Sequence, residues 1–267
     1  MSDGMKIGII GFGNMGKALA LALKRGGNFY LFAYDCDRKK TQAVKGLCIS
    51  KNIEELIKNA DVVVLSVKPQ DIKNLLREIK KYLAEKKPLF ISIAAGISTQ
   101  LLQKYLGEIK IIRAMPNLAA KVEESISFVS KGKLASKKDL DAAAKILKAV
   151  GEVIAIQEKY LDKATAVSGS GPGYIFYFMN ALYEGALELG FSKKNAKKMA
   201  EQIFWGSAKL AKESKEDFKL LIKGVTSKGG TTEAALEVFN ERGLEKIIKE
   251  GVKAACQRAS EITKQQD

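Results

Sequence analysis

The chain has 267 residues and carries 45 Lys and Arg against 30 Asp and Glu, which gives a formal charge of +15 at pH 7. It contains no histidine, which excludes a histidine general base, a Ser-His-Asp triad and a histidine-ligated metal site. Its hydrophobic content of 46% is typical of a folded protein, and the length is sufficient for two packed domains.

Three other classes of protein are disfavoured by the pattern of residues. The lysines are spread along most predicted helices without interleaved aromatic residues, which favours a solvated basic surface over a nucleic-acid-binding one. Cys36, Cys48 and Cys256 form no CxxC pair, so we expect no disulfide framework, no metal site and a cytoplasmic location. No apolar run is long enough to span a membrane, and the first five residues lack the positive charge of a secretory signal, so we expect neither segment.

The first part of the chain alternates short apolar runs with amphipathic stretches, which predicts βα units around a parallel sheet with helices on both faces. The predicted strands are 7–10, 29–34, 62–67, 89–93 and 109–112. The predicted helices are 15–24, 39–45, 53–58, 72–82 and 99–105, and a further strand, helix and strand are expected between 125 and 156.

The clearest motif is Gly11-Phe-Gly13-Asn14-Met15-Gly16, directly after the first predicted strand and at the start of the first predicted helix. In this context Gly11 permits a tight turn, Gly13 lets the backbone approach a pyrophosphate, and Gly16 lets the helix pack on the strand. We therefore favour a dinucleotide-binding site over a purely structural turn.

Asp35 ends the second predicted strand, where a carboxylate could accept a hydrogen bond from the ribose of NAD and repel the 2′-phosphate of NADP. Arg38, Lys39 and Lys40 follow at once and could bind that phosphate instead. Capping of the next helix is an equally good explanation for Asp35. The choice between NADH and NADPH therefore stays open.

After about residue 159, strand patterns stop and helix-period stretches occupy 174–189, 194–212, 231–239 and 244–263. The predicted fold is an α/β Rossmann-like dinucleotide-binding domain, residues 1–160, followed by an all-α domain, residues 161–267. Two glycine-rich segments, 168–173 and 227–232, interrupt the helical pattern. They could be hinges, or a plain N-cap at Thr231, but two such loops favour a substrate pocket.

Taken together, the motifs resemble those of the pyrroline-5-carboxylate reductase family over essentially the whole chain. The motifs that carry the resemblance are 11–16, Val67-Lys68-Pro69, Ser92-Ile-Ala-Ala-Gly96, Arg113-Ala-Met-Pro-Asn117, 165–174 and 227–232. The resemblance implies reduction of 1-pyrroline-5-carboxylate to L-proline by NADH or NADPH, the last step of proline biosynthesis. It also implies a C-terminal dimerisation domain, a site completed across the dimer interface and, in many members, a homodecamer.

The resemblance also implies roles for individual residues. Cofactor contacts are expected from the glycine motif (Gly11, Gly13, Asn14, Met15, Gly16), from Asp35, Arg38, Asn52, Val67, Lys68 and Pro69 on the adenosine side, and from Ala94, Ala95, Met115, Pro116 and Asn117 near the nicotinamide. The substrate carboxylate is expected on Ser227, Gly229, Gly230, Thr231 and Thr232, and the Thr232 hydroxyl is also expected to reach the ring nitrogen as the catalytic group. No metal is expected, because the chain lacks histidine and CxxC pairs, and no strong general acid is needed, because a protonated imine is already electrophilic.

Five positions depart from the family pattern. Leu118-Ala-Ala120 stands where Thr-Pro-Ala is common, Ser125 where Gly is typical, Gly173 where Ala is usual, and Lys228 where Pro is common. These departures leave room for a non-catalytic dinucleotide-binding relative. A β-hydroxyacid dehydrogenase, with Lys163 or Lys228 as its catalytic lysine, is the rival enzyme class.

Overall fold

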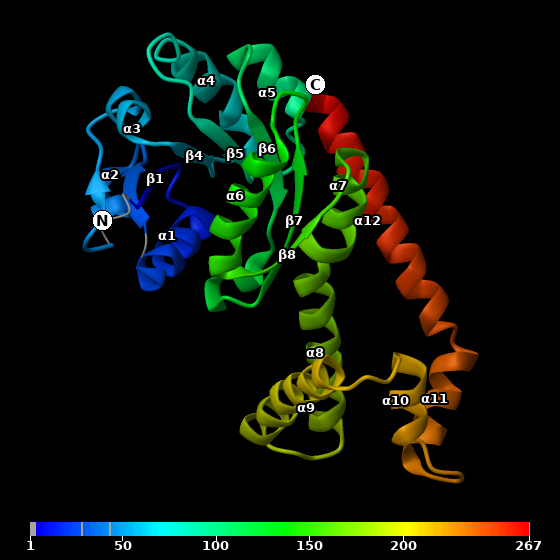
Figure 1. The fold of residues 1–267 in the computed structure, drawn as a ribbon. Helices are drawn as coiled ribbons and strands as arrows, with labels where there is room; N and C mark the ends of the chain where they lie inside the picture. The colour runs from blue at the N-terminus through cyan, green and yellow to red at the C-terminus, as the bar shows by residue number, and fades with distance from the viewer. Residues whose placement is uncertain (1–3, 28, 43, 267) are drawn as a thin grey trace. The chain divides into compact units, whose positions relative to one another are not determined.

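The computed structural model describes residues 4–27, 29–42 and 44–266. Of the first five residues, which were expected to form no secretory signal, residues 1–3 lie outside the described ranges. The chain forms two compact units (Figure 1). The first contains the residues up to Ser170 and those from Ala255 onward, and the second contains Gly171–Ala254. The second unit is therefore an insertion within the first.

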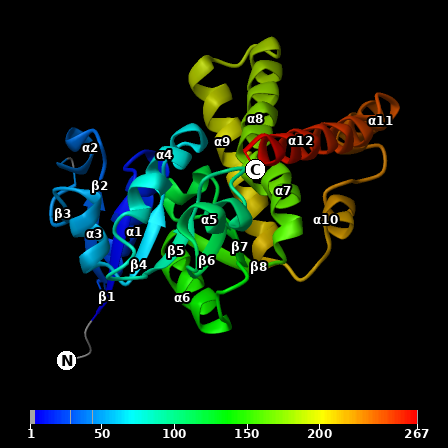
Figure 2. The same cartoon turned by 90° about the horizontal axis from the view of Figure 1, so that it is seen from above.

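The first unit is built on one sheet whose strands, among the described residues, follow the order β3-β2-β1-β4-β5-β6-β7-β8 (Figure 2). Every neighbouring pair is parallel except β6 and β7, which are antiparallel. The bounds are β1 Met5–Ile10, β2 Phe29–Tyr34, β3 Cys48–Ile49, β4 Val62–Leu65, β5 Leu89–Ser92, β6 Ile111–Met115, β7 Ser125–Lys131 and β8 Gly151–Ala155.

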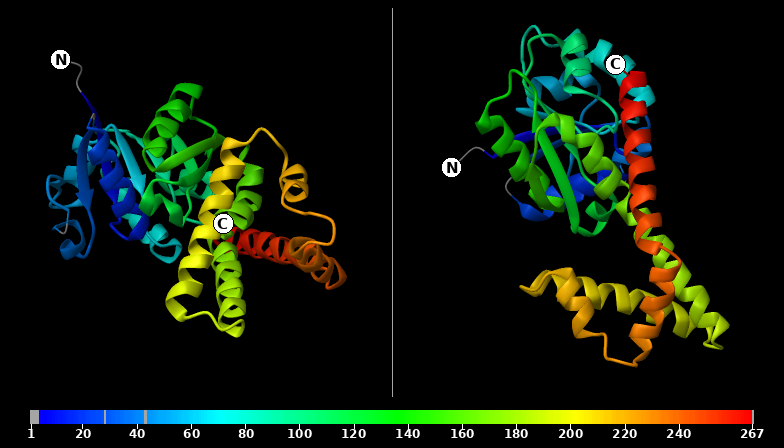
Figure 3. Two further views of the ribbon diagram at one scale, coloured as in Figure 1. Left: turned by 90° about the horizontal axis from the view of Figure 1, so that it is seen from below. Right: turned by 90° about the vertical axis from the view of Figure 1, so that its right-hand side faces the viewer.

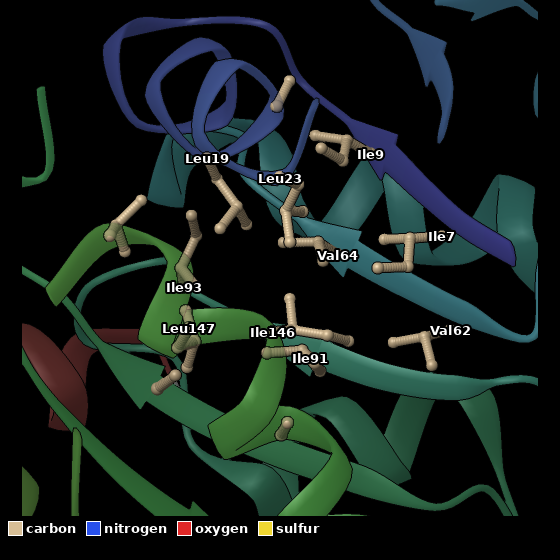
Figure 4. Packing of buried hydrophobic residues seen from close by; sticks show 14 of the residues in the cluster. Ile7, Ile9, Leu19, Leu23, Val62, Val64, Ile91, Ile93, Ile146 and Leu147 are labelled. Atoms are coloured by element: carbon tan, nitrogen blue, oxygen red, sulfur yellow. The ribbon is translucent and has the colours of Figure 1, made fainter. Parts of the chain in front are cut away.

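Helices cover both faces of this sheet, as the apolar strands require. They are α1 Asn14–Gly26, α2 Arg38–Gln42, α3 Ile53–Asn59, α4 Pro69–Lys80, α5 Thr99–Leu106, α6 Lys137–Leu147 and α7 Leu161–Ala164. Buried side chains of α1 and α6 pack against one face (Figure 4), and those of α3, α4 and α5 pack against the other. The first unit thus has a closed apolar core on each side of its sheet.

The second unit is helical, and α8 and α9 pack against each other within it (Figure 3). Its helices are α8 Gly171–Glu188, α9 Lys193–Glu213, α10 Phe218–Gly224, α11 Thr231–Glu241 and the first part of α12 Leu244–Gln266. Its buried hydrophobic residues are three alanines, Ala186, Ala196 and Ala200. A unit with so little buried apolar surface lacks a core of its own.

The end of α12 returns to the first unit and is fastened there by a polar cluster. The buried Arg113 on β6 pairs with Asp162, with 2.8 Å between Nη2 and Oδ1. The Thr263 hydroxyl of α12 donates to the same Asp162 oxygen at 3.0 Å. Next to Thr263 in α12, Ile262 lies close to Gly96: a Cβ placed on Gly96 would be 2.6 Å from Ile262 Cγ2. The end of α12 therefore packs closely against the loop after β5.

The predicted fold class is confirmed, with one antiparallel strand pair in place of an all-parallel sheet. The strand predicted at 62–67 ends at Leu65, and the one predicted at 109–112 lies at Ile111–Met115. The short elements β3 and α10 are additional to the predicted ones. The helix predicted at 39–45 is described as Arg38–Gln42, and its residue 43 lies outside the described residues.

The expectation of a loop at 168–173 was wrong. Residues Thr165–Gly169 form a π-helical turn, in which the Ser170 N–H donates to the Thr165 carbonyl at 2.9 Å, and α8 begins at Gly171. A Cβ on Gly169 would lie 2.8 Å from Met115 Cε, so a larger residue there would displace the end of the Met115 side chain. Residues 161–170 also pack with the first unit, whereas the predicted domain boundary placed them in the second.

Two further findings concern the described part of the chain. None of its helices is long and apolar enough to cross a membrane. Its Cys, Asp and Glu side chains form no group of three or more that could hold a metal ion.

Candidate functional site

The glycine motif lies at the turn from β1 into α1, and its three glycines have different surroundings. Gly11 has φ +92°, and a Cβ there would lie 2.5 Å from the Ser66 carbonyl oxygen. A Cβ on Gly16 would lie 2.1 Å from the Gly11 carbonyl oxygen, whereas one on Gly13 would meet no atom within 4 Å. Gly11 and Gly16 are therefore required by the protein's own packing, and Gly13 faces space that a pyrophosphate could fill.

Asp35 ties this turn to the end of β2. Its buried carboxylate accepts the Phe12 N–H at 2.6 Å and the Asp37 N–H at 2.8 Å, with the Lys40 ammonium 3.5 Å away. Burial raises the pKa of the Asp35 carboxyl, but these two hydrogen bonds and the Lys40 charge outweigh burial and hold the pKa below its usual value. Asp37, whose Oδ1 accepts the Lys39 N–H at 3.2 Å, takes the capping position at α2 that the sequence offered to Asp35.

Two cavities lie beside the glycine turn. One, of about 200 Å³, is lined by Ile10, Gly11, Tyr34, Asp35, Cys36, Ile53, Val67, Asp71 and Leu75. The other, of about 470 Å³, is lined by Phe12, Gly13, Asn14, Lys17, Ala18, Leu21, Lys40 and Lys121. Three lysines and the N-terminus of α1 make the larger cavity basic, which suits phosphate groups, while the smaller cavity is mostly apolar and suits an adenosine.

The remaining residues expected on the adenosine side begin helices or lie close to their starts. Asn52 caps α3, with its Oδ1 accepting the Glu55 N–H at 2.9 Å. Lys68 precedes α4, and Pro69 occupies the first helical position, where a missing N–H costs nothing. The exposed Arg38 guanidinium donates to the Lys51 carbonyl at 3.4 Å.

The residues expected near the nicotinamide lie at the carboxyl ends of β5 and β6. These strands are parallel neighbours, so the segments 94–95 and 115–117 share one edge of the sheet, where ligands bind in such folds. Ala94 is buried, and Asn117 caps a short 3₁₀ turn, Leu118–Val122, by accepting the Ala119 N–H at 3.1 Å. At this edge the loop after β5 therefore offers two small side chains, and the turn after β6 is held by its Asn117 cap.

The residues expected to bind substrate form the start of α11 in the second unit. Gly229 has φ +72°, and a Cβ on Gly230 would lie 2.4 Å from the Ser227 hydroxyl oxygen, so both glycines are needed for this tight turn. The Gly230 N–H donates to the Ser227 carbonyl at 3.0 Å, and the Gly229 N–H donates to Glu233 Oε2 at 2.5 Å. By their helical position, the Thr231 and Thr232 N–H groups have no acceptor within α11.

The predicted site residues thus fall into two groups, one in each unit. Several residues of interest were not predicted. Glu233 could have been found from the sequence, because it is an acidic residue in the first turn of a helix. Lys121 could not, because only tertiary packing brings it to the cavity beside the glycine turn.

Comparisons with known protein families match both parts of the chain. Residues 158–262 match the family model described as pyrroline-5-carboxylate reductase dimerisation. Residues 6–96 match the one described as NADP oxidoreductase, coenzyme F420-dependent. The dimerisation match begins close to the predicted boundary at 160/161.

Individual relatives are similar over nearly the whole chain. The pyrroline-5-carboxylate reductase of Methanosarcina acetivorans is 35% identical, with 98% of this chain and 99% of the relative covered. That of Aquifex aeolicus is 33% identical, with 97% of each covered.

Solved structures agree with these relatives. The pyrroline-5-carboxylate reductase of Coxiella burnetii superposes with a TM-score of 0.91 at 36% identity, covering 96% of this chain and 98% of that one. The Plasmodium falciparum pyrroline carboxylate reductase, solved with NADP bound, has a TM-score of 0.86 at 29% identity, covering 98% and 99%. Prephenate dehydrogenase from Aquifex aeolicus, at 18% identity and a TM-score of 0.53, shares the fold alone.

Proposed function

The chain belongs to the pyrroline-5-carboxylate reductase family, and from this premise we propose how its own residues carry out the NAD(P)H-dependent reduction of 1-pyrroline-5-carboxylate to L-proline. The observation that carries the proposal is the hydrogen bond from the Gly229 N–H to the Glu233 carboxylate at 2.5 Å. It means that the main chain of the glycine-rich turn can hold a carboxylate oxygen, the group by which this substrate is recognised.

The substrate carboxylate is held at the start of α11. The N–H groups of Thr231 and Thr232 point out of the first helical turn, where the helix dipole favours an anion. The Ser227 hydroxyl, beside Gly230, adds a further donor. When the substrate arrives, the Glu233 carboxylate leaves Gly229 because two carboxylates repel each other, and the Gly229 N–H then joins the clamp.

The chemical step depends on positioning more than on proton transfer. The Thr232 hydroxyl orients the ring nitrogen of the protonated imine, which already activates the neighbouring carbon. When bound, the reduced nicotinamide supplies the hydride that this carbon accepts. A chain without histidine can perform this step because no side chain has to change its protonation state.

The cofactor is held by the glycine turn and the strand ends of the first unit. Gly13 and the lysines of the larger cavity receive the phosphates, and the smaller cavity receives the adenosine. The Asp35 charge is partly balanced by Lys40 and its oxygens already accept two N–H groups, so it does not exclude a 2′-phosphate. We expect turnover with both NADPH and NADH.

The working form is a homo-oligomer, with a dimer as the basic unit. The uncovered apolar side chains of the second unit need a partner of matching character, and a second copy of this chain supplies one. The free thiols of Cys36, Cys48 and Cys256 suit the reducing cytoplasm as the working compartment. Light scattering distinguishes the dimer from the decamer found in other members of the family.

The test is an absorbance assay of NADPH and NADH oxidation with pyrroline-5-carboxylate, run on wild type and Thr232→Ala. We expect the variant to lose about tenfold to a hundredfold in turnover, the value of one hydrogen bond to a charged group, while its coenzyme affinity stays the same. Thr232→Ser, which keeps the hydroxyl, is the matched control. An unchanged rate in Thr232→Ala would remove this residue from the mechanism.

The same protein sample decides between the enzyme classes. Oxidation of β-hydroxyacids without imine reduction would favour the dehydrogenase alternative with Lys163 or Lys228. Coenzyme binding without any turnover would favour a non-catalytic relative.

A further inference from the structure

Two buried serines hold the turn that follows β6. The backbone N–H of Asn117 donates to the Ser125 hydroxyl oxygen at 3.0 Å, and the Asn117 side-chain Nδ2 donates to the Ser168 hydroxyl oxygen at 3.4 Å. The Ser168 hydroxyl in turn donates to the Ile126 carbonyl of β7 at 3.2 Å. Asn117 is therefore tied to β7 directly and also through the π-helical turn.

These bonds fix both the backbone and the side chain of Asn117. Its Oδ1 accepts the Ala119 N–H at 3.1 Å, so the amide group has a partner on each side and only one orientation satisfies both. Ser125 and Ser168 are buried, so no solvent competes for their hydroxyls. The end of the Met115 side chain lies close to Gly169 of the π-helical turn, where a Cβ would be 2.8 Å from Met115 Cε.

The two serines come from different parts of the sequence pattern. Ser168 belongs to the glycine-rich segment that was expected to be a loop, and Ser125 is the first residue of β7. β7 and β8 can approach closely at Ser125 because residue 151 of β8 is a glycine, and a Cβ on Gly151 would lie 2.0 Å from the Ser125 carbonyl oxygen.

We propose that Ser125 and Ser168 are positioning residues that hold the 115–117 turn in the shape that receives the nicotinamide ring. The inference rests on the proposed function, which places Met115, Pro116 and Asn117 beside the nicotinamide. Neither serine touches the reacting atoms. Both act through Asn117, by fixing a surface that otherwise has to order when the coenzyme binds.

The experiment compares Ser125→Gly, Ser125→Ala and Ser168→Ala with wild type in calorimetric binding. The ligands are the coenzyme that wild type binds more tightly and its adenosine half, 2′,5′-ADP for NADPH or ADP for NADH. We expect the dissociation constant of the whole coenzyme to rise about threefold to tenfold in each variant, while that of the adenosine half stays unchanged. The two Ser125 variants lose one hydrogen bond to Asn117, and Ser168→Ala loses its bonds to Asn117 and to the Ile126 carbonyl.

Ser127→Ala is the matched control. Ser127 lies two residues along β7, is equally buried, and its hydroxyl has no hydrogen-bond partner among the described residues. The Ser127→Ala variant should bind the whole coenzyme and its adenosine half with the dissociation constants of wild type.

Two outcomes would overturn the inference: whole-coenzyme affinity unchanged in all three variants, or a loss of equal size for the whole coenzyme and its adenosine half. In either case wild type still binds and turns over the coenzyme, so the proposed function stands. Failure of wild type itself to bind NADPH or NADH would reject the proposed function instead.

Discussion

The two units of this chain differ in how far their apolar side chains are buried. In the first unit, Leu23, Leu56 and Phe90 are fully buried in clusters on the two faces of the sheet. In the second unit, Leu189 in the turn after α8 is 81% exposed and Phe218 at the start of α10 is 75% exposed. The first unit therefore contains the contacts that stabilise it, whereas the second depends on contacts with another chain.

The same difference distinguishes the residues proposed to bind the coenzyme from those proposed to bind the substrate. The residues proposed to bind the coenzyme lie on a sheet whose strand ends are fixed by buried cores on both faces, so their geometry is set within one chain. The turn proposed to bind the substrate, at the start of α11, belongs to a unit in which no residue of α10 or α11 is buried. We expect this turn to reach its working shape only after two chains associate.

The largest expected effect comes from placing a charge on the uncovered face of the second unit. Leu210 of α9 is 58% exposed, and Leu210→Glu should prevent association and abolish turnover, because a carboxylate cannot be buried in an apolar interface. Light scattering and the coenzyme-oxidation assay measure the two effects.

Leu134→Glu is the control for that change. Leu134 lies in the first unit and is 45% exposed, so an equal charge on an equally sized side chain should leave both the molar mass and the rate unchanged. If both variants behave alike, the contrast between the units is wrong.

An effect of intermediate size is expected from substitutions at Gly13 and Gly16, in the turn from β1 into α1, and it should differ between the two positions. Gly16→Ala should reduce both thermal stability and coenzyme binding, because its Cβ would lie 2.1 Å from the Gly11 carbonyl oxygen. Gly13→Ala should keep the stability of the wild type and lose coenzyme affinity alone, since the added methyl group meets no protein atom within 4 Å. Gly13→Val, with a larger side chain, should abolish binding.

Differential scanning fluorimetry and calorimetric titration measure the two quantities in parallel. Equal losses of stability in the two alanine variants would contradict the different surroundings of these glycines.

The smallest expected effect is a pH dependence that belongs to the first unit. The pKa of the Asp35 carboxyl is lower in the folded protein than the unfolded value of about 3.9, so its contribution to stability is fully present above that value. The contribution is lost as the pH falls through the lower, folded pKa.

The measurement is thermal unfolding of wild type and Asp35→Asn between pH 7 and pH 3. We expect the stability difference between them to be constant near neutrality and to shrink below about pH 4. A difference that grows as the pH falls would reverse the sign and reject the role given to Asp35.

Much of the fold could be predicted from local pattern. The strand β2 was predicted with its observed bounds, 29–34, because an apolar aromatic run there ends at Asp35. The two-residue strand β3 is too short to show a period, and α10 spans only seven residues, although Asp217 does cap it, with its side chain accepting the Leu220 N–H.

The candidate site could be predicted where its residues are contiguous and not where packing assembles it. The glycine motif and the turn before α11 each occupy six residues or fewer and have a mechanism that can be read directly. The ties on Asn117 join residues 8 and 51 positions apart, and no local pattern encodes such pairs. The π-helical turn was missed for a related reason. Its Gly169, followed by Gly171 and Gly173, resembles the glycines of a loop, and only the structure shows that Gly169 lies against Met115.

The return of α12 to the first unit has a consequence for cutting or tagging the chain. Residues 255–266 are sequence neighbours of the helical insertion but structural components of the sheet-bearing body, to which Asp162 anchors Thr263. A fragment that stops at residue 254 would therefore lack Ile262 and expose the surface around Gly96 that Ile262 covers. Such a truncation would destabilise the first unit, to which residues 255–266 belong. Conversely, a protease nick in the middle of α12 should leave the released peptide attached without any covalent link.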